Sequence, residues 1–422
     1  MALRQQPRRI PLSIAVASME RGKAALPTGT PVRWADRSMM AGARQRRILA
    51  ALWKHGSLSR RALHDCTGIR PNTITLDVSE LLECEILRET DGTLGQRGRP
   101  AIPLEIDRDR RDVLGVAIEP HRVSIARLDL GGRLLETRQH ADLRDVRDII
   151  TSAEALLASF TRDSTLAVGL SASGSVDPGR HRMLSGPDWH EQEEFSLERC
   201  YDLVGDRPFI LDNDMHALAA RWVLHRKIDA ADEDTLLVDF EDGRLGASLL
   251  VNGRPNRGCV ASANELGHTR LPVETERCHC GQCGCLERIC SSKFLQRRSG
   301  STDTLARRAA DYRGSDEALA ELIDLLAMGI ANAVTFSRVH RLVLISEFTR
   351  HPSFTESLIA AIRGQIVSDV EPHVQIEVWQ QVARQAAETA GWLALANLFL
   401  EGWNDTQTLT AFHHGAGSAS SG

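Results

Sequence analysis

The feature that most restricts what this chain can fold into is a group of cysteines in its second half. Four of the nine cysteines fall within residues 278–285, shortly after the segment Glu265-Leu-Gly-His268. Zinc is held by four thiolate or imidazole ligands in a tetrahedron, and clustered cysteines in a long chain favour such a site over a network of disulfides. The expected ligands are His268, Cys278, Cys280 and Cys285.

Two further side chains in this loop leave the set of ligands open. Cys283 is a fifth candidate and His279 a sixth, because spacing alone does not give the geometry of the loop. Free buried thiols without a metal are the alternative interpretation. Because three thiolates and one imidazole already complete a tetrahedral shell, we expect a structural zinc rather than a catalytic one.

Helical periodicity and capping signals mark the region that follows the N-terminal arm. Apolar residues recur at helical spacing within residues 48–53, and Gly56 follows as a stop signal. Ser59 can cap a second short helix that stops at Gly68, and Pro71 can open a third. This pattern is typical of a helix-turn-helix, whose last helix enters the major groove of DNA. The side chains expected to contact DNA from this helix are Arg70, Asn72, Thr73 and Thr75.

A basic turn follows the third helix. The segment Gln96-Arg97-Gly98-Arg99-Pro100 precedes an alternation of apolar residues that starts at Ile102, which predicts a β-wing with a basic tip. Arg97, Gly98 and Arg99 are therefore further candidates for DNA contacts, and a plain basic turn is the alternative.

Charge is distributed unevenly along the chain. Residues 1–47 contain ten Arg or Lys and two acidic residues, whereas the formal net charge of the whole chain is −5. A basic end on an acidic body favours a DNA-binding arm joined to a small-molecule domain, with a solvated tail as the alternative. Aromatic residues make up only 5% of the chain, which argues against stacking platforms for single-stranded nucleic acid. Since no apolar run approaches the roughly 20 residues of a membrane span, we expect a cytoplasmic protein.

A pattern of strands followed by helices occurs twice. Residues 113–135 and 235–253 each predict a meander of three strands, which indicates a duplicated α/β unit and two lobes that face a cleft. Chance similarity of hairpins is the alternative. The expected organisation is a flexible basic arm (1–40), a winged helix-turn-helix (41–107), an effector domain (108–400) with lobes at about 108–230 and 231–400, and a flexible tail (401–422).

The order of these motifs resembles the transcriptional-regulator branch of the ROK family, named for repressors, open reading frames and kinases. The series comprises the winged helix-turn-helix, a Gly-Arg-Pro wing, Asn213-Asp214, Glu-x-Gly-His and Cys-x-Cys-Gly-x-x-Gly-Cys-Leu-Glu. The cysteine motif is highly specific, whereas a helix-turn-helix alone fits many regulators. The resemblance covers about residues 44–400 and implies an α/β, actin-like sugar-kinase fold of two lobes, usually assembled as dimers or tetramers.

The resemblance also implies roles for individual residues. It matches the zinc ligands to the histidine and three cysteines named above, and it matches sugar contacts to Asn213, Asp214, Glu265, His268 and Glu287. Carboxylates and amides suit sugar hydroxyls, which both donate and accept hydrogen bonds. In the family's kinases, the residue that matches Asp214 accepts the proton of the sugar hydroxyl. On sequence alone, Asn213-Asp214 fits a surface turn equally well.

Three loops that hold the nucleotide in the family's kinases have lost their chemistry here. The first reads Ala117-Ile-Glu-Pro-His-Arg122, the second is reduced to Glu241–Gly246, and a Gly-Gly-Gly turn corresponds to Ile345–Thr349. Phosphates need glycine-rich backbone whose N–H groups can approach them. We therefore expect a sensor with no catalytic residues and no bound ATP rather than an enzyme.

These observations together predict a sequence-specific regulator, a repressor of carbohydrate metabolism. Its expected partners are double-stranded operator DNA, a sugar or sugar-phosphate effector and further copies of itself in a homodimer or homotetramer. A sugar kinase with a fused DNA-binding domain and a regulator controlled by a protein partner are the alternatives. Leu76 and Asp77 stand where related regulators often carry polar or basic residues, so attraction to phosphates must depend on the wing and on arginines outside the third helix.

Overall fold

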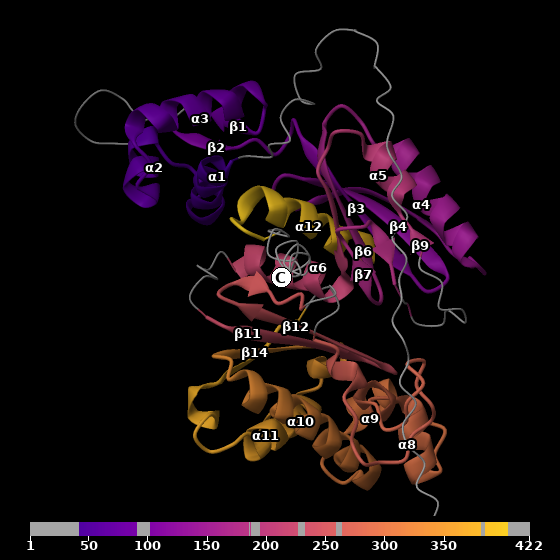
Figure 1. The fold of residues 1–422 in the computed structure, drawn as a ribbon. Coiled ribbons are helices and arrows are strands. Elements are labelled where there is room, and N and C mark those ends of the chain that lie inside the picture. Colours follow the sequence, from indigo (N-terminus) through magenta and orange to yellow (C-terminus); the bar gives the residue numbers. More distant parts are fainter. Residues whose placement is uncertain are drawn as a thin grey trace, which may run out of the picture.

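The computed structural model describes residues 42–90, 102–184, 186, 195–226, 233–258, 264–380 and 385–403. Within these ranges the chain forms a small N-terminal helical unit and two α/β lobes (Figure 1). The arm expected at 1–40 and the wing residues Arg97, Gly98 and Arg99 lie outside the described residues, as does most of the tail expected at 401–422.

Local sequence signals set the ends of the helices in the N-terminal unit. These helices are α1 (Ala43–His55), α2 (Arg60–Thr67) and α3 (Pro71–Glu83). Ser59 Oγ accepts a hydrogen bond of 3.2 Å from the backbone N–H of Ala62, which satisfies a free donor at the start of α2. Gly68 ends α2 in the left-handed conformation, and Pro71 opens α3. The helices and the short turn between them therefore lie where the sequence predicts them.

A short antiparallel strand pair packs against these helices. Its strands are β1 (Leu87–Glu89) and β2 (Leu104–Ile106). Leu104 also bridges to Leu58, which fixes the pair to the segment between α1 and α2. The base of the predicted wing is thus present, and its tip belongs to residues 91–101, which are not described.

The two lobes contain five-stranded sheets with the same topology. The first sheet comprises β3 (Asp112–Glu119), β4 (Arg122–Asp129), β5 (Leu134–His140), β6 (Thr165–Ala172) and β10 (Phe209–Asn213), in the order β10-β6-β3-β4-β5. The second comprises β11 (Thr235–Glu241), β12 (Arg244–Val251), β13 (Arg254–Pro255), β14 (Arg341–Ile345) and β15 (Gln375–Val378), in the order β13-β12-β11-β14-β15. In each sheet an antiparallel meander is extended by two parallel strands. The predicted duplication is confirmed, because chance hairpins would not share this extension.

Shorter elements complete the two lobes. The first lobe adds α4 (Val146–Phe160), α5 (Glu198–Val204) and a small sheet of β7 (Val176–Asp177), β8 (Arg182–Met183) and β9 (Phe195–Ser196). The second adds α7 (Leu286–Ile289), α8 (Ser292–Ser299), α9 (Leu305–Asp311), α10 (Glu317–Ser337), α11 (Pro352–Gln365) and the 3-10 turns η2 (Leu266–His268), η3 (Phe348–Arg350) and η4 (Glu371–His373). Among the described residues, α10 alone is long and apolar enough to cross a membrane, yet half of its apolar window is buried and its leucines pack in the core of the second lobe.

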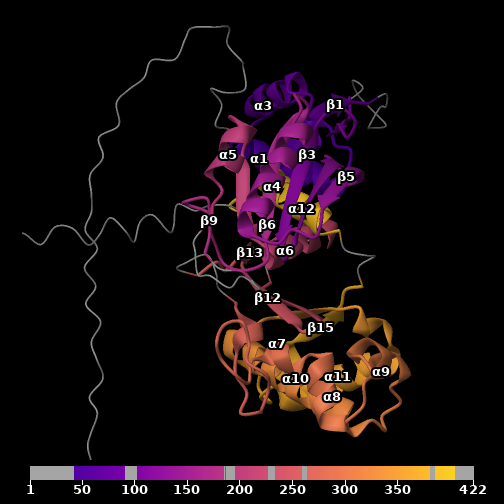
Figure 2. The same cartoon turned by 90° about the vertical axis from the view of Figure 1, so that its right-hand side faces the viewer.

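Two helices, α6 (Asp214–Arg226) and α12 (Ala386–Phe399), lie side by side between the two sheets (Figures 1 and 2). α12 follows the last strand of the second sheet but packs on β3, β4 and β6 of the first. Nearly every residue of α12 is buried, so it needs apolar neighbours on all sides, and the first sheet and α6 supply them. The expected division into lobes near residue 231 did not include this crossing of α12 from the second lobe to the first sheet.

The contact between α12 and the first sheet depends on glycine. A Cβ atom on Gly115 of β3 would lie 2.0 Å from the carbonyl oxygen of Ala387 and 2.2 Å from the backbone nitrogen of Gly391. Both neighbours are backbone atoms, which cannot rotate away as a side chain can. The absence of a side chain at Gly115 is therefore what lets the helix reach the sheet.

The N-terminal unit is joined to the first lobe through Trp53 of α1. The indole Nε1 donates a 2.8 Å hydrogen bond to the carbonyl oxygen of Leu224, near the end of α6. The same ring stacks on Phe399 of α12 with centroids 4.8 Å apart and meets Trp392 edge-on at 6.1 Å. The helical unit thus contacts the last turns of both central helices.

We expect Gly115→Ala to destabilise the protein by about 1–3 kcal/mol, since the added methyl group must displace the backbone of α12. Gly364→Ala is the matched control, because a Cβ atom there meets nothing within 4 Å and alanine is the better helix former in α11. Urea denaturation measures both variants. An equal free energy of unfolding in the two would contradict the close packing of α12.

Candidate metal centre and effector pocket

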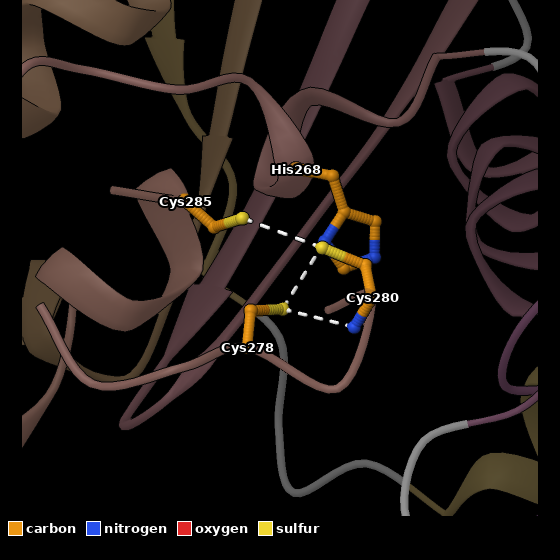
Figure 3. Close-up of side chains that lie close together, drawn as sticks. All are labelled: His268, Cys278, Cys280 and Cys285. Carbon is orange, nitrogen blue, oxygen red and sulfur yellow. Dashed lines mark hydrogen bonds between the residues drawn. The ribbon is translucent and has the colours of Figure 1, made fainter. Parts of the chain in front are cut away.

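Four side chains of the second lobe converge on one point, as Figure 3 shows. They are His268, Cys278, Cys280 and Cys285, whose ligand atoms all lie within 4.8 Å of one another. Cys278 Sγ is 3.6 Å from His268 Nδ1, and the sulfurs of Cys280 and Cys285 are 3.5 Å apart. In a tetrahedral site with bonds of about 2.0–2.3 Å, neighbouring ligand atoms lie about 3.4–3.8 Å apart. The cluster can therefore hold a metal ion of that geometry.

Backbone pairing in the loop brings these residues together. Leu271 N–H donates to the carbonyl oxygen of Gly284 at 2.9 Å. Arg270, which lies two residues after His268, forms a β-bridge with Cys285. Gly284 has a φ of +82°, and a Cβ atom there would lie 2.4 Å from the carbonyl oxygen of Leu271. Glycine at this position thus allows the strand-like segment and the cysteine loop to approach each other.

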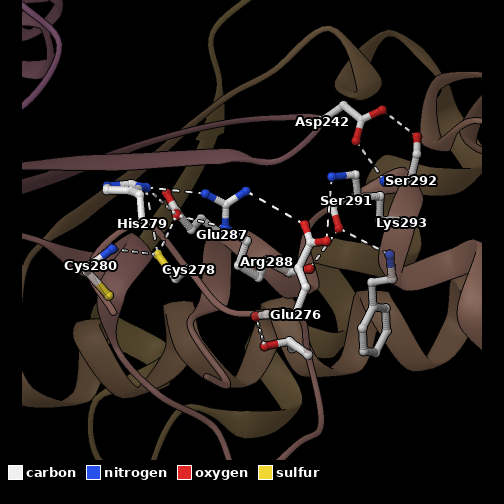
Figure 4. A network of polar contacts seen from close by, with 12 residues as sticks. Asp242, Glu276, Cys278, His279, Cys280, Glu287, Arg288, Ser291, Ser292 and Lys293 are labelled. Atoms are coloured by element: carbon white, nitrogen blue, oxygen red, sulfur yellow. Dashed lines mark hydrogen bonds and ion pairs between the residues drawn. The ribbon is translucent and has the colours of Figure 1, made fainter. Parts of the chain in front are cut away.

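The two further candidates for ligation behave differently. Cys283 is exposed and belongs to neither of the possible ligand groups formed by the described residues. His279 belongs to a second group with His268, Cys278 and Glu287. Glu287 Oε1 accepts a hydrogen bond from Cys278 Sγ at 2.9 Å and lies 3.3 Å from His279 Nδ1 (Figure 4). The group with three sulfur atoms offers the softer ligands, which suit zinc better.

The residues matched to sugar contacts line one cavity of about 420 Å³ in the cleft between the lobes. They are Asn213, Asp214, Glu265, His268 and Glu287. Asn213 ends β10 and Asp214 begins α6, so this pair lies at a junction of strand and helix inside the cleft rather than in a surface turn. Two lobes therefore contribute to one pocket.

The side-chain amide of Asn213 forms hydrogen bonds to the backbone through both its nitrogen and its oxygen. Its Nδ2 donates to the carbonyl oxygen of Gly174 at 2.8 Å, and its Oδ1 accepts from the N–H of Met215 at 2.7 Å. The residue thus fixes the first turn of α6. Asp214 follows it, and one of its carboxylate oxygens accepts a 2.9 Å hydrogen bond from Ser173 Oγ.

Burial perturbs the two carboxylates that face each other across the pocket. Burial raises the pKa of Asp214 above its ordinary value, and the nearby Arg244 guanidinium does not compensate for it. Burial also raises the pKa of Glu265, and the negative charges of Asp214 and Glu287 add to this effect. A ligand that donates hydrogen bonds to both carboxylates would stabilise their charged forms.

Three arginines of the pocket were not predicted from the sequence. Arg122, Arg244 and Arg288 line the same cavity. Arg122 holds both oxygens of Glu119 at 2.9 and 2.7 Å, and Arg244 Nη2 lies 3.8 Å from Asp214 Oδ2. Arg122 and Arg244 begin equivalent strands, β4 and β12. An arginine at the same position of both meanders is therefore the sequence signal that could have indicated them.

Two of the three segments matched to the kinase nucleotide loops make fixed local contacts. In the turn between β11 and β12, Asp242 accepts hydrogen bonds from the backbone N–H and the hydroxyl of Ser292 at the start of α8. Gly243 N–H donates to the carbonyl oxygen of Cys290 at 2.8 Å. Where the third loop would receive adenosine, Phe348 is 1% exposed and packs near Phe240 at 6.3 Å. These two segments are thus held by fixed contacts and lack the backbone flexibility of a glycine-rich loop.

A buried ion pair beside the pocket joins the two lobes and the segment that follows α12. Arg257, which follows β13, donates to Asp212 Oδ2 at 2.6 and 2.9 Å and to the carbonyl oxygen of Trp403 at 2.8 Å. His216 Nδ1 lies 2.6 Å from the other oxygen of Asp212. Burial alone would raise the pKa of Asp212, but Arg257 and His216 together hold that pKa well below its ordinary value.

We expect Arg257→Met to lower the free energy of unfolding by about 3 kcal/mol at pH 7, because it leaves a buried carboxylate without its main partner. Since the pKa of Asp212 is depressed in the folded state, its stabilising effect is complete above the unfolded pKa of about 4 and is lost as pH falls below it. Urea denaturation at pH 7 and pH 3.5 should thus give a smaller difference between variant and wild type at the lower pH.

Arg180→Met is the matched control, because its side chain is 75% exposed and makes one distant ion pair. A difference for Arg257→Met that stays constant with pH would contradict the role of the Asp212 carboxylate.

The sequence is similar to those of known transcriptional regulators. The sequence is 26% identical over 259 residues to the DNA-binding transcriptional dual regulator NagC of Escherichia coli strain K12, a match that covers 58% of this chain and 61% of that protein. The chain thus spans about three fifths of the length of this curated relative. It is 20% identical to the xylose repressor of Bacillus subtilis, over 80% of this chain and 90% of that protein.

Solved structures share the fold. A ROK family transcriptional regulator, a homologue of the E. coli Mlc protein, superposes with a TM-score of 0.71 at 21% identity and covers 85% of this chain and 96% of its own. A ROK family glucokinase from Streptomyces griseus superposes with a TM-score of 0.52 at 21% identity, over 66% and 98%. The expected two-lobed, actin-like fold is thereby confirmed. Because the sequence model of the ROK family matches residues 113–398, more than half of the chain, this protein belongs to the ROK family.

Proposed function

We propose that this protein is a sequence-specific DNA-binding transcriptional regulator, a repressor of carbohydrate metabolism, whose lobes bind a sugar without phosphorylating it. The observation that carries the proposal is an imbalance within the cleft. The residues matched to sugar contacts line one cavity, whereas the turns matched to nucleotide contacts lack the glycine-rich backbone that phosphates need and place the carboxylates of Glu119 and Glu241 in the same cavity. Relatives named as a dual regulator and as a xylose repressor support the same function.

The charge of the cavity bears on the class of effector. Six carboxylates line it, against three arginines. This excess of negative charge favours a neutral sugar or an amino sugar, whose hydroxyl or ammonium groups donate to carboxylates, over a sugar phosphate. No ATP takes part in this function, and no residue acts as a catalyst.

The metal that suits the cluster is a structural zinc ion held by His268, Cys278, Cys280 and Cys285. Its chemistry is that of a closed shell of three thiolates and one imidazole, which leaves no open position for catalysis. Glu287 follows the last ligand by two residues and hydrogen-bonds Cys278, so an ordered metal loop also orders this wall of the pocket.

DNA binding is assigned to α3 and to the wing. Arg70, Asn72 and Thr75 are exposed and Thr73 is half-buried at the start of α3. The proposed DNA contacts also include Arg97, Gly98 and Arg99 of the predicted wing, which lie outside the described residues. A cytoplasmic homodimer or homotetramer would present two such surfaces to the half-sites of one operator.

Two helices offer a physical route from the pocket to the DNA-binding unit. The first turn of α6 lines the cavity, and its last turn accepts the indole hydrogen bond of Trp53. The first residues of α12, Ala386 and Thr389, line an adjoining cavity of about 170 Å³, and Phe399 at its other end stacks on Trp53. A ligand that binds one arrangement of these helices better than another would change the position of the N-terminal unit.

Two alternative functions can be distinguished from this proposal by experiment. A sugar kinase with a fused DNA-binding domain would use Asp214 as a base, as in the family's kinases. A regulator controlled by a protein partner would need no sugar in the cleft. ATP-dependent turnover identifies the first, and an absence of stabilisation by any sugar identifies the second.

We expect Cys280→Ser to lose the one zinc ion per chain, because it removes an essential thiolate, and to lower the melting temperature. Cys283→Ser is the matched control and should keep the metal, since Cys283 lies outside the cluster. Elemental analysis of protein purified without chelator measures both. Zinc retained in Cys280→Ser but lost in Cys283→Ser would reassign the ligand.

We expect a neutral sugar or amino sugar to change operator affinity by about tenfold without ATP, a coupling typical of allosteric proteins. A thermal-shift screen of sugars, amino sugars and sugar phosphates identifies the ligand, and fluorescence anisotropy with a selected operator measures its effect. Asp214→Ala should abolish sugar binding and leave DNA binding intact, whereas the exposed Asp163→Ala should change neither.

Trp53→Ala separates binding from coupling. This variant should still bind the sugar, but the sugar should no longer alter its operator affinity, because both helix contacts of the indole are gone. ATP-dependent formation of a sugar phosphate that disappears in Asp214→Ala would overturn the proposal in favour of the kinase.

A further inference from the structure

The exposed face of α3, which the proposed function turns toward DNA, carries a large apolar side chain. Leu76 is 68% exposed in the second turn of this helix, next to the exposed Thr75. The core side of the helix is formed instead by Ile74, Val78 and Leu81. Leu76 contributes nothing to the core, so its side chain is available to contact a partner.

The hydroxyl groups on the same face are already bonded within the helix. Thr75 Oγ1 donates to the carbonyl oxygen of Pro71 at 3.0 Å, and Ser79 Oγ donates to that of Thr75 at 2.9 Å. Their protons are therefore not free to read acceptors on base edges. Leu76 therefore presents methyl groups to a partner, and Thr75 presents its methyl group and a hydroxyl oxygen that can only accept.

The acidic residue beside Leu76 is turned away from this face. Asp77 is 5% exposed and forms an ion pair with Arg44 Nε at 3.3 Å. It therefore does not repel phosphates, contrary to what its position in the sequence suggests. Arg70 at the start of α3 and Arg61 on α2 are exposed on the same unit and complement the charge of a DNA backbone.

We propose that Leu76, together with the methyl group of Thr75, reads the C5-methyl groups of thymine in the major groove of the operator. The thymine methyl group is the one apolar feature that base pairs present in that groove, so an exposed leucine in a recognition helix discriminates thymine from the other bases. This inference rests on the proposed DNA-binding function and goes beyond it, because it assigns the base and the chemical group that are recognised.

Deoxyuridine provides the test, since it differs from thymidine only in the missing methyl group. The operator is first selected from a random duplex library with the full-length protein. Each thymine is then replaced singly by deoxyuridine, and dissociation constants are measured by fluorescence anisotropy at one salt concentration. For the wild type, replacement at one or two positions should weaken binding about fourfold, the ratio that corresponds to burying one methyl-sized group.

Leu76→Ala should bind the unmodified operator several-fold more weakly, and the same deoxyuridine positions should weaken its binding less than they weaken that of the wild type, because only the methyl group of Thr75 remains to contact thymine. Alanine is at least as good a helix former as leucine, so the unchanged melting temperature of this variant would exclude a folding defect. Leu135→Ala, at a leucine that is 47% exposed on β5, is the matched control and should retain the full response to deoxyuridine.

The remaining outcomes would overturn the proposal. DNA binding that no deoxyuridine substitution weakens, or that weakens equally in wild type and Leu76→Ala, would remove the thymine contact and leave the regulator function intact. A changed oligomeric state of Leu76→Ala in sedimentation experiments would assign the leucine to a contact between proteins. If no duplex sequence is enriched at all, the proposed function itself fails together with this inference.

Discussion

The packing of α12 between the two lobes is the interaction on which the rest of the structure depends. This helix belongs by sequence to the second lobe, yet it covers the first sheet and lies along α6. Gly115 permits the approach, because a side chain there would collide with the backbone of α12, and Gly391 leaves room for the side chain of Leu128. One helix therefore closes the core of the first lobe, connects it to the second lobe and supplies the surface that receives Trp53.

Sequence reasoning succeeded where the signal was local. Ser59, Gly68 and Pro71 set helix ends through capping and backbone conformation, which depend on a few neighbouring residues. Alternating strands predicted both meanders for the same reason. The return of α12 could not be predicted, because a helix that is apolar on nearly every side carries no periodicity to indicate which surface it will cover.

The same distinction applies to the pocket and the metal centre. The cysteine cluster was predictable because few residue types bind a metal and their spacing is restricted. Arg122 and Arg244 were missed because an arginine after a hairpin turn is common, and only the paired topology of the two sheets places both in one cavity. Asn213 was matched to sugar binding, but its amide also fixes the first turn of α6, which only the geometry shows.

The contacts of Trp53 attach the N-terminal unit to the two central helices. They join the N-terminal unit to α6 and to α12, and α12 packs on the first sheet, so this unit is attached to the first lobe. The second lobe contributes Glu265 and Glu287 to the cavity, whereas Asp214 comes from the start of α6. A ligand that contacts all three carboxylates fits best at one angle between the lobes, and the difference in affinity between angles sets the free energy available for regulation. For the proposed regulator, the displacement relevant to DNA binding is thus that of the first lobe, with its helical unit, relative to the second.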